Sequence, residues 1–431
     1  MTLSRLDILN LEWPNSDRDL HIVTPPLVYL EKKYNIIYKT KSIFNAYLYL
    51  LIYRPKVLIL SNFVGASINY NIVKLAYLSG IKVVSFISEG NIKANEVDIF
   101  LWGKNEHNFY LDKLLVWTGR SRNLFLNYYP ELSLKISVVG STGFDRYKLL
   151  NFQNKTSFLN DNKINYKKII GIASWGFDHF FEESNKYDYN YYINLLGNYQ
   201  VERHQNDLYK LQKIYKQLIE KNKDILFILR YHPGTIDFEK NEFYGLDKYD
   251  NVFISNKFKN NQYKISDLIN ISDLWIGYET TTALESWLLG KQTFLINPSG
   301  SDFIRENVYE GSPIVETAEE AQILIDEYFT TKTIKKFELL EKKRREIIKD
   351  VIEYGDGKNY VRAAKEIIKV YNQPDKEIKF TLKVYKEAFK QILKLILSKT
   401  IFQKRWPELN YKSNFAKKYQ DMYDKVISDN I

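Results

Sequence analysis

The chain has 431 residues, more than one hydrophobic core usually serves, so we expect two domains. It contains no cysteine, which excludes disulfides and thiolate metal sites, and no apolar run reaches the roughly 18–20 residues of a membrane-spanning helix. A polar start leads straight into a strand pattern, unlike a signal peptide, and this predicts a cytoplasmic protein. The net charge of +10 suits nucleic acid or anionic lipid. Because the basic residues are dispersed and no nucleic-acid motif accompanies them, we expect no nucleic-acid partner.

Short runs rich in Val, Ile and Leu alternate with amphipathic stretches in residues 1–150. Runs of this length are typical of strands buried on both faces, and the stretches 18–33, 43–53 and 67–79 have helical periodicity. Such alternation predicts βαβ units and a parallel sheet, and hence a first Rossmann-like domain. The predicted strands are 6–11, 35–39, 56–61, 82–87, 98–102, 114–117 and 136–140.

A second domain of the same kind is predicted for residues 165–372. A polar stretch rich in Asn and Lys, 151–168, separates it from the first and is interpreted as a linker. Two such domains in series predict an α/β protein with a cleft between them, and ligands bind doubly wound sheets at the carboxyl ends of the strands. The predicted strands are 168–173, 225–230, 251–255, 273–277 and 293–296, with long helices at 189–222 and 332–353.

The remaining segment, 373–431, is predicted to be a basic helical tail without strands. Its stretch 378–401 mixes apolar residues with six lysines. A basic helix with an apolar face suits peripheral contact with an anionic membrane. It equally suits packing against the body with the lysines in water.

The segment RYHPGT, 230–235, directly follows a predicted strand and so places His232 at a strand's carboxyl end. Pro233 and Gly234 predict a sharp turn, and Arg230 would add positive charge. An imidazole in this position can bind or protonate a phosphate oxygen. The alternative is a turn histidine without a chemical role.

Three consecutive threonines follow the predicted strand 273–277, at the expected start of a helix. Their hydroxyls and backbone N–H groups would form an anion site, and Glu285, about one turn into the helix, could accept hydrogen bonds from a ribose. Thr282 and Glu285 also fit a capping box, which stabilises a helix by about 0.5–2 kcal/mol without any ligand. The candidate binding residues here are Thr280, Thr281, Thr282 and Glu285.

Other loops after predicted strands carry further candidates. Glu89 follows the strand 82–87 and could act as general base toward a hydroxyl, or could be a loop glutamate in solvent. The loop that begins with Ser174, Trp175 and Gly176 could bring backbone amides to a phosphate. STGFDR, at 141–146, is interpreted as a turn that shapes the hinge.

EYGDGKNYVR, at 353–362, has Asp356 between two glycines and is interpreted as a helix stop and restart. No Asp-x-Asp stands at the end of a predicted strand and no His or Cys ligand spacing occurs, so we expect no metal site.

In chain order, Glu89-Gly90, His232-Pro233 and Thr280-Thr281-Thr282 resemble three motifs of bacterial GT-B sialyltransferases and polysialyltransferases: a D/E-D/E-G motif, an HP motif and a Ser/Thr-rich motif. The phrases RDL, ISEGN, VVGSTGFDRY and YGDGK are also similar to bacterial surface carbohydrate biosynthesis proteins and, more distantly, to capsule Kdo transferases. The resemblance covers most of 1–372 and leaves the tail unmatched. It departs from the first motif at Ser88, where the family has an acid, so Glu89 alone remains as base.

This resemblance implies a metal-independent, inverting glycosyltransferase of GT-B fold. Its donor would be a CMP-linked nonulosonic acid of the sialic, pseudaminic or Kdo type, held by the second domain without any other cofactor. The acceptor, a surface glycan or lipid-linked glycan, would lie on the first domain. Glu89 would deprotonate the acceptor hydroxyl, and His232, helped by the threonine amides, would stabilise the departing phosphate.

Three alternatives remain open. A retaining transferase could use the same donor with a different carboxylate as nucleophile. CDP-glycerol transferases share the GT-B layout and a similar HP element, so a glycerophosphotransferase is the second alternative. The third is a non-catalytic GT-B-like scaffold that a membrane assembly holds through the basic tail.

Overall fold

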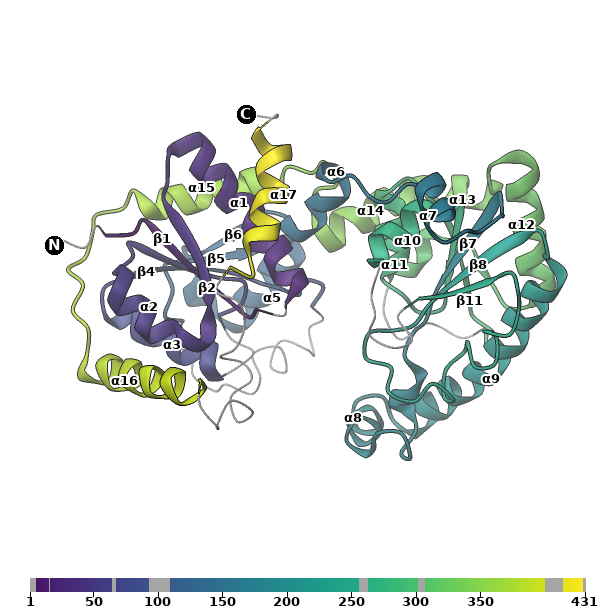
Figure 1. Cartoon of the computed structure of the whole chain (residues 1–431), viewed down its shortest axis with the longest axis horizontal. Coiled ribbons are helices and arrows are strands. Elements are labelled where there is room, and N and C mark those ends of the chain that lie inside the picture. Colours follow the sequence, from purple (N-terminus) through teal and green to yellow (C-terminus); the bar gives the residue numbers. More distant parts are fainter. Residues whose placement is uncertain are drawn as a thin grey trace. The chain divides into compact units, whose positions relative to one another are not determined.

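The computed structural model describes residues 5–14, 16–63, 67–92, 109–255, 263–300, 307–399 and 414–428. The chain forms two compact units (Figure 1). Unit 1 combines Met1–Leu150 with Ile348–Ile431, and unit 2 is Asn151–Ile347.

Unit 1 contains a parallel six-stranded sheet in the order β2-β1-β3-β4-β5-β6. Every residue of β1, β3 and β4 is buried, as expected for strands that helices cover on both faces. The sequence predicts all six strands, but β2 begins three residues later than expected, because Asn35 (φ 54°) first ends the preceding helix in a left-handed conformation. The predicted strand 98–102 lies outside the described residues. The strands are β1 (Ile8–Glu12), β2 (Tyr38–Ser42), β3 (Val57–Leu60), β4 (Lys82–Phe86), β5 (Lys113–Val116) and β6 (Ile136–Val138).

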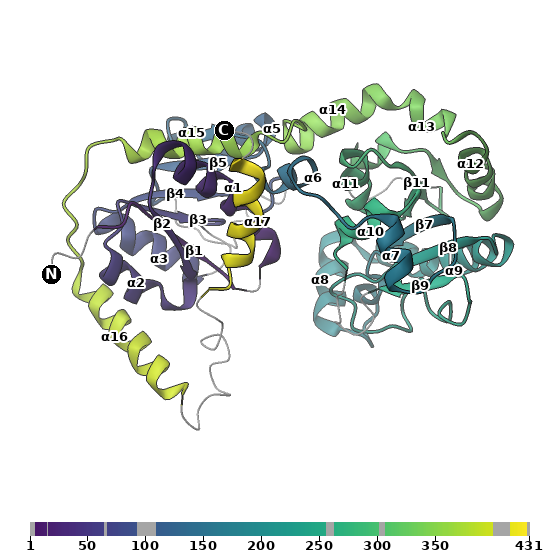
Figure 2. The same cartoon turned by 45° about the horizontal axis from the view of Figure 1, so that its top comes forward.

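Helices cover both faces of this sheet. One core joins the sheet to α1 and α15, and a second joins its other face to α2, α3 and α16. Figure 2 shows α15 on one side of the sheet and α2 with α16 on the other. The helices are α1 (Asp17–Tyr34), α2 (Ala46–Tyr53), α3 (Ser67–Leu78), α5 (Gly119–Tyr128), α6 (Arg146–Leu149), α15 (Asn359–Tyr371), α16 (Leu382–Leu397) and α17 (Lys417–Ser428).

The C-terminal part of the chain corrects the predicted boundaries 165–372 and 373–431. The helix α15 buries Ala363, Ala364 and Ile367 in the core of unit 1. Asp145 fixes the start of α15, because its carboxylate accepts a hydrogen bond from the backbone N–H of Tyr360 (2.7 Å). Residues 348–372 therefore complete unit 1, and the chain passes from unit 2 to unit 1 within α14 (Glu341–Ile352). The predicted helix stop and restart at 353–362 is confirmed.

The C-terminal segment is helical, as predicted, and packs on unit 1. Tyr423 and Ile427 of α17 are buried beside α1, and the Tyr423 hydroxyl lies 2.7 Å from His21 Nδ1. The helix α16 rests on α2 and buries Val384 and Ala388. Within the described ranges, no helix has the length and apolarity that crossing a bilayer requires.

Unit 2 contains a second parallel sheet of six strands, in the order β12-β11-β10-β7-β8-β9. Five of its strands match the predicted ones, and the two-residue β12 was not predicted. The strands are β7 (Lys168–Ala173), β8 (Ile225–Arg230), β9 (Val252–Ser255), β10 (Leu274–Gly277), β11 (Gln292–Ile296) and β12 (Ile314–Val315). Together the two sheets, their covering helices and the C-terminal helices confirm the predicted fold class.

The helices of unit 2 include one in the stretch interpreted as a linker. There α7 buries Phe158 against Phe253 and Tyr263, so the stretch 151–168 belongs to unit 2 and contributes one side chain to its core. The predicted helix 332–353 is divided into α13 and α14. The helices are α7 (Lys155–Asp161), α8 (Lys186–Leu196), α9 (Asn198–Lys221), α10 (Ile265–Ile271), α11 (Thr282–Leu288), α12 (Ala318–Thr331) and α13 (Lys335–Leu339).

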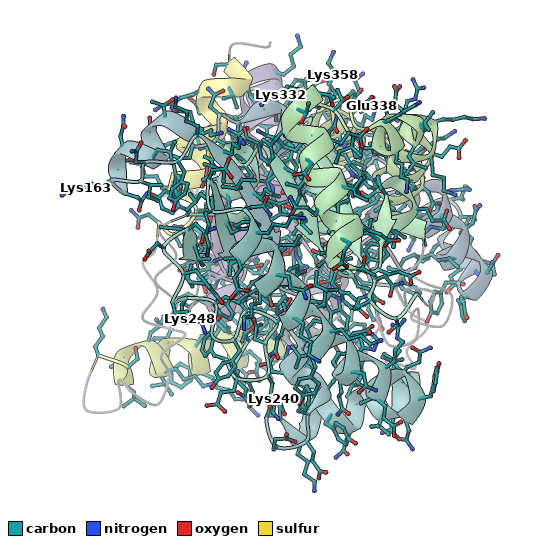
Figure 3. All side chains as sticks on the ribbon, turned by 90° about the vertical axis from the view of Figure 1, so that its right-hand side faces the viewer. Lys163, Lys240, Lys248, Lys332, Glu338 and Lys358 are labelled. Carbon is teal, nitrogen blue, oxygen red and sulfur yellow. The ribbon has the colours of Figure 1, made fainter. Side chains whose placement is uncertain are left out.

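Lysines of unit 2 are distributed over several loops and helix ends. Figure 3 labels four of them, Lys163, Lys240, Lys248 and Lys332. The positive charge of these residues is therefore spread over the surface of the unit.

Candidate functional site

A pocket of about 140 Å³ opens at the carboxyl ends of three neighbouring strands in unit 2, β10, β7 and β8. The loops that follow these strands supply most of its wall, and α8 adds one tyrosine. We call it the histidine pocket. Its lining residues are Ser174, Trp175, Gly176, His179, Phe180, Tyr192, His232, Glu279, Thr280 and Thr281.

The loop after β7 is held in place by a buried carboxyl group. Glu242 accepts hydrogen bonds from the Trp175 backbone N–H (2.9 Å) and the Ser174 hydroxyl (3.1 Å). Burial raises the pKa of Glu242 to about 7. Gly176 then turns the loop with φ 89°, and a Cβ there would lie 3.1 Å from His232 Nδ1. The Ser174 hydroxyl is thus used to shape the loop, and Gly176 lets the loop approach the imidazole.

His232 has an exposed side chain at the end of β8, as the sequence predicts. Its Nδ1 accepts a hydrogen bond from the Gly234 backbone N–H (3.2 Å), so in the neutral ring the proton resides on Nε2. The ring stands edge to face with His179, with 6.1 Å between the centroids. His179 Nδ1 lies 2.8 Å from a carboxylate oxygen of Asp188. The pocket therefore contains two imidazoles from different loops, one of which has a carboxylate partner.

A buried ion pair lies behind the histidine pocket. Arg203 of α9 donates to Glu279 (3.1 Å), and both side chains are almost fully buried. His204 is stacked against Trp175 and Phe180, with 4.8 and 4.6 Å between ring centroids. Arg203, His204 and Glu279 are not among the predicted site residues. The sequence signal for Arg203 and His204 is their position on the apolar side of the long amphipathic helix α9, which is buried.

The threonines adopt a different arrangement from the predicted capping box. The helix α11 begins at Thr282, and its N-cap is Thr281, whose side chain caps no backbone N–H, so Glu285 closes no box with Thr282. Instead, the Thr280 hydroxyl accepts from the Thr282 N–H (3.2 Å), and the Thr282 hydroxyl accepts from Trp275 Nε1 (2.8 Å). The exposed Thr281 is the threonine best placed to meet a ligand.

The histidine pocket brings together six of the predicted site residues. Arg230 is buried as the last residue of β8, and desolvation lowers the pKa of its guanidinium to about 10. Pro233 and Gly234 form the turn beside His232, while Thr282 and Glu285 belong to α11. The predicted residues that line the pocket are Ser174, Trp175, Gly176, His232, Thr280 and Thr281. Those that do not line it are Arg230, Pro233, Gly234, Thr282 and Glu285 of unit 2 and Glu89 of unit 1. The lining residues that the sequence did not single out are His179, Phe180, Tyr192 and Glu279.

In unit 1, carboxylates gather at the carboxyl ends of β1 and β4 and at the start of α1. Glu12 ends β1 and accepts hydrogen bonds from the backbone N–H and the hydroxyl of Ser61 (2.8 and 2.6 Å). Burial and the nearby Asp19 raise the pKa of Glu12 well above its usual range. Asp19 accepts from the Ser16 hydroxyl (2.5 Å), and burial raises its pKa as well. Together with Glu89, these two carboxyl groups form what we call the acidic edge.

Glu89 is the exposed member of the acidic edge. Its side chain is 62% exposed and forms an ion pair with Arg18 (2.5 Å). The neighbouring Gly90 packs so closely on Trp117 that a Cβ would lie 2.2 Å from the ring. Ser88 is buried, so an acid at this position would also be buried. The sequence predicted one carboxylate here, whereas the structure places three in the neighbourhood.

Asp19 was not among the predicted site residues. It belongs to the sequence RDL, which is similar to surface carbohydrate biosynthesis proteins but was assigned no function. Among the described residues, no group of three or more His, Asp or Glu side chains is arranged to hold a metal ion.

Comparison with known proteins gives matches among solved structures alone. No family model matches the chain, and no curated protein matches it. The UDP-GlcNAc 2-epimerase from Methanocaldococcus jannaschii is 16% identical with a TM-score of 0.54, covering 84% of this chain and 99% of its own. UDP-GlcNAc 2-epimerase from Neisseria meningitidis bound to UDP-GlcNAc is 12% identical, with a TM-score of 0.51 and coverage of 86% and 100%. A variant of the wall teichoic acid polymerase TagF soaked with CDPG is 13% identical, with a TM-score of 0.51 and coverage of 85% and 89%.

The chain has a GT-B fold. At these identities the likeness concerns the fold alone, and the chemistry has to be argued from the histidine pocket and the acidic edge.

Proposed function

We propose that the protein is an inverting, metal-independent glycosyltransferase whose CMP-linked donor binds in the histidine pocket. The observation that carries this proposal is the position of His232 at the carboxyl end of β8, inside a pocket that also presents Thr281 and the loop after β7. Ligands of doubly wound sheets bind at such strand ends. Solved structures of similar fold bind UDP-GlcNAc or were soaked with CDPG, which supports a nucleotide-linked donor.

The proposed reaction needs a hydrogen-bond donor beside the leaving phosphate, where negative charge develops. An acceptor hydroxyl attacks the anomeric carbon, a new C–O bond forms, and the bond from that carbon to the phosphate oxygen breaks with its electron pair leaving on CMP. Because Nδ1 accepts from Gly234, the neutral His232 ring has its N–H on Nε2, and this group can donate a hydrogen bond to the departing phosphate oxygen and stabilise its negative charge. CMP leaves with less negative charge than a nucleoside diphosphate, which suits a pocket that offers two imidazoles and hydroxyl groups.

The acceptor hydroxyl, on a surface glycan or lipid-linked glycan, needs a base. We assign this role to Glu89, which is exposed and therefore accessible to an acceptor. Arg18 donates a hydrogen bond to the Glu89 carboxylate (2.5 Å) and so fixes its orientation. Asp19 and Glu12 are buried near Glu89. They would not touch the acceptor themselves, but would influence the electrostatic environment of the Glu89 carboxylate.

A second candidate is transfer of glycerol phosphate from CDP-glycerol, favoured by the similarity to TagF. This reaction also releases CMP, but the bond that breaks is the P–O bond of the diphosphate, and the acceptor attacks phosphorus. The same His232 would face the departing phosphate. The two reactions therefore share a leaving group and differ in the donor.

A thermal-shift panel of CMP, CDP-glycerol, UDP, UDP-GlcNAc and GDP tests the donor. We expect CMP to raise the melting temperature of the wild-type protein and to lose this effect in His232→Ala. Glu239→Ala, an exposed residue in the same loop but outside the pocket, is the matched control and should respond as wild type does.

If UDP or GDP raises the melting temperature and CMP does not, the proposal of a CMP-linked donor is rejected. Stabilisation by CDP-glycerol followed by glycerol phosphate transfer would favour the second candidate, and epimerisation of UDP-GlcNAc would reject both transfer reactions.

A further inference from the structure

The helix α16 is built with three separate stripes. Residues three or four apart share one side of an α-helix. Val384, Ala388 and Gln391 form the first stripe and face α2. The second stripe is apolar and consists of Leu382, Tyr385, Phe389, Ile392, Leu393, Ile396 and Leu397. The third is basic and consists of Lys383, Lys386, Lys390 and Lys394.

The first stripe fastens α16 to unit 1. Val384 and Ala388 are buried in the core that α2 shares with the sheet, and the side-chain oxygen of Gln391 accepts from the Leu48 backbone N–H (3.1 Å). Before the helix, Arg54 donates to the backbone oxygen of Ile378 (3.0 Å) and lies over the ring of Phe380. The helix is therefore docked in one orientation, which fixes where its other two stripes point.

The apolar stripe faces away from unit 1. Leu382 is 84% exposed, Phe389 61% and Ile396 58%, and the other four members are also exposed. In contrast, the amphipathic helix α15 of the same unit buries its apolar stripe in a core. Seven exposed apolar side chains on one helix form a contiguous patch, and such patches usually mark an interaction surface.

The basic stripe borders this patch. The helix carries four lysines and a single acid, Glu387, which pairs with Lys390 (2.7 Å). An apolar stripe beside a row of lysines matches the boundary between acyl chains and anionic headgroups. An antiparallel pair of α16 helices from two copies would instead set their lysine rows side by side, where like charges repel.

We propose that α16 is a membrane-surface anchor: its apolar stripe inserts at the level of the lipid headgroups while its lysines bind anionic lipid. The helix would lie in the plane of the membrane (Figure 2 shows it beside α2). This anchor would keep the protein at a bilayer surface, and it does not depend on which donor the histidine pocket binds.

Vesicle co-sedimentation of the full chain without nucleotide tests the anchor. We expect binding to phosphatidylcholine vesicles that contain phosphatidylglycerol, much weaker binding to pure phosphatidylcholine, and loss of binding at high salt. Phe389→Asp combined with Ile396→Asp should reduce binding at least about tenfold. Lys383, Lys386, Lys390 and Lys394 changed together to Gln should abolish the preference for anionic vesicles. Ile323→Asp on α12 is the matched control, because Ile323 is an exposed apolar residue on another helix.

Two results would overturn the proposal. One is equal binding of the Phe389→Asp/Ile396→Asp variant and the wild type while both keep the same melting temperature. The other is a wild-type protein that does not bind vesicles but forms a dimer in sedimentation velocity, while the Phe389→Asp/Ile396→Asp variant is a monomer. This result would show that the apolar stripe contacts a second copy of the chain.

Discussion

The two sheets have the same parallel architecture, yet their carboxyl ends carry different chemistry. In unit 2 the strand ends collect two imidazoles, aromatic rings and two threonines around an open pocket. In unit 1 they collect carboxyl groups, two of them buried. In both units the fold provides a binding position at the carboxyl ends of the parallel strands. The loops and first helical turns that follow these strands determine which side chains lie there. The histidine pocket suits an anion, whereas the acidic edge suits a neutral or cationic group.

The contrast between the histidine pocket and the acidic edge can be tested by mutation, and we expect the largest effect on activity at His232. His232→Ala should lower the rate of CMP release from the donor by about 10²–10³-fold, because the leaving phosphate loses a hydrogen-bond donor that stabilises its charge. The rate is measured by following CMP with saturating donor and acceptor. An equal loss in Glu239→Ala would show that the loop as a whole, and not the imidazole, matters.

A large effect on stability is expected at the buried ion pair behind the pocket. Arg203→Met leaves the Glu279 carboxylate buried without its cation, which should destabilise unit 2 by about 3–5 kcal/mol in denaturant unfolding. Arg203→Met combined with Glu279→Gln should recover part of the loss, because the unpaired charge is removed. Equal stability of the single and double variants would contradict the ion-pair explanation.

At the acidic edge, Glu89→Gln should reduce turnover by about 10²-fold while leaving CMP affinity close to wild type. The affinity is measured by titration calorimetry with CMP. Asp19→Asn should change turnover less than Glu89→Gln, because Asp19 is buried and has no direct access to the acceptor. The reverse order would move the role of base from Glu89 to Asp19.

The smallest effect concerns pH, and each unit has one buried carboxyl group to compare. Burial raises the pKa of Glu242 in unit 2 and of Asp145 in unit 1, each to about 7. Between their usual values and pH 7 the folded protein binds more protons than the unfolded chain, so stability falls as the pH rises through this window, by at most about 1.4 kcal/mol per pH unit for each group.

Glu242→Gln should weaken the pH dependence of the free energy of unfolding for unit 2, and Asp145→Asn should do the same for unit 1. Both are measured in unfolding curves recorded from pH 5 to 7. A wild-type protein that becomes more stable over this range would contradict the assignment.

The sequence was sufficient for the longer apolar strands, but not for the two-residue β12 or for the residues that tertiary contacts bring to the site. His232 could be identified because it directly follows a long apolar run. Arg203 and Asp19 could not, because both lie in helices, and their importance depends on burial against another element. The same reason explains the misplaced boundary at 372: the periodicity of α15 predicts a helix with one apolar side, but not which sheet covers that side.

The way α15 and α17 complete unit 1 also determines the order in which the units can fold during synthesis. Unit 2 is one continuous stretch, so all of its contacts can form once residue 347 has left the ribosome. Unit 1 must wait longer, because its first helix packs against α17, and His21 and Tyr423 lie 402 residues apart. The half of the protein that is made first is therefore the half that finishes folding last, and until then the face of its sheet that α15 covers remains open to chaperones or to aggregation.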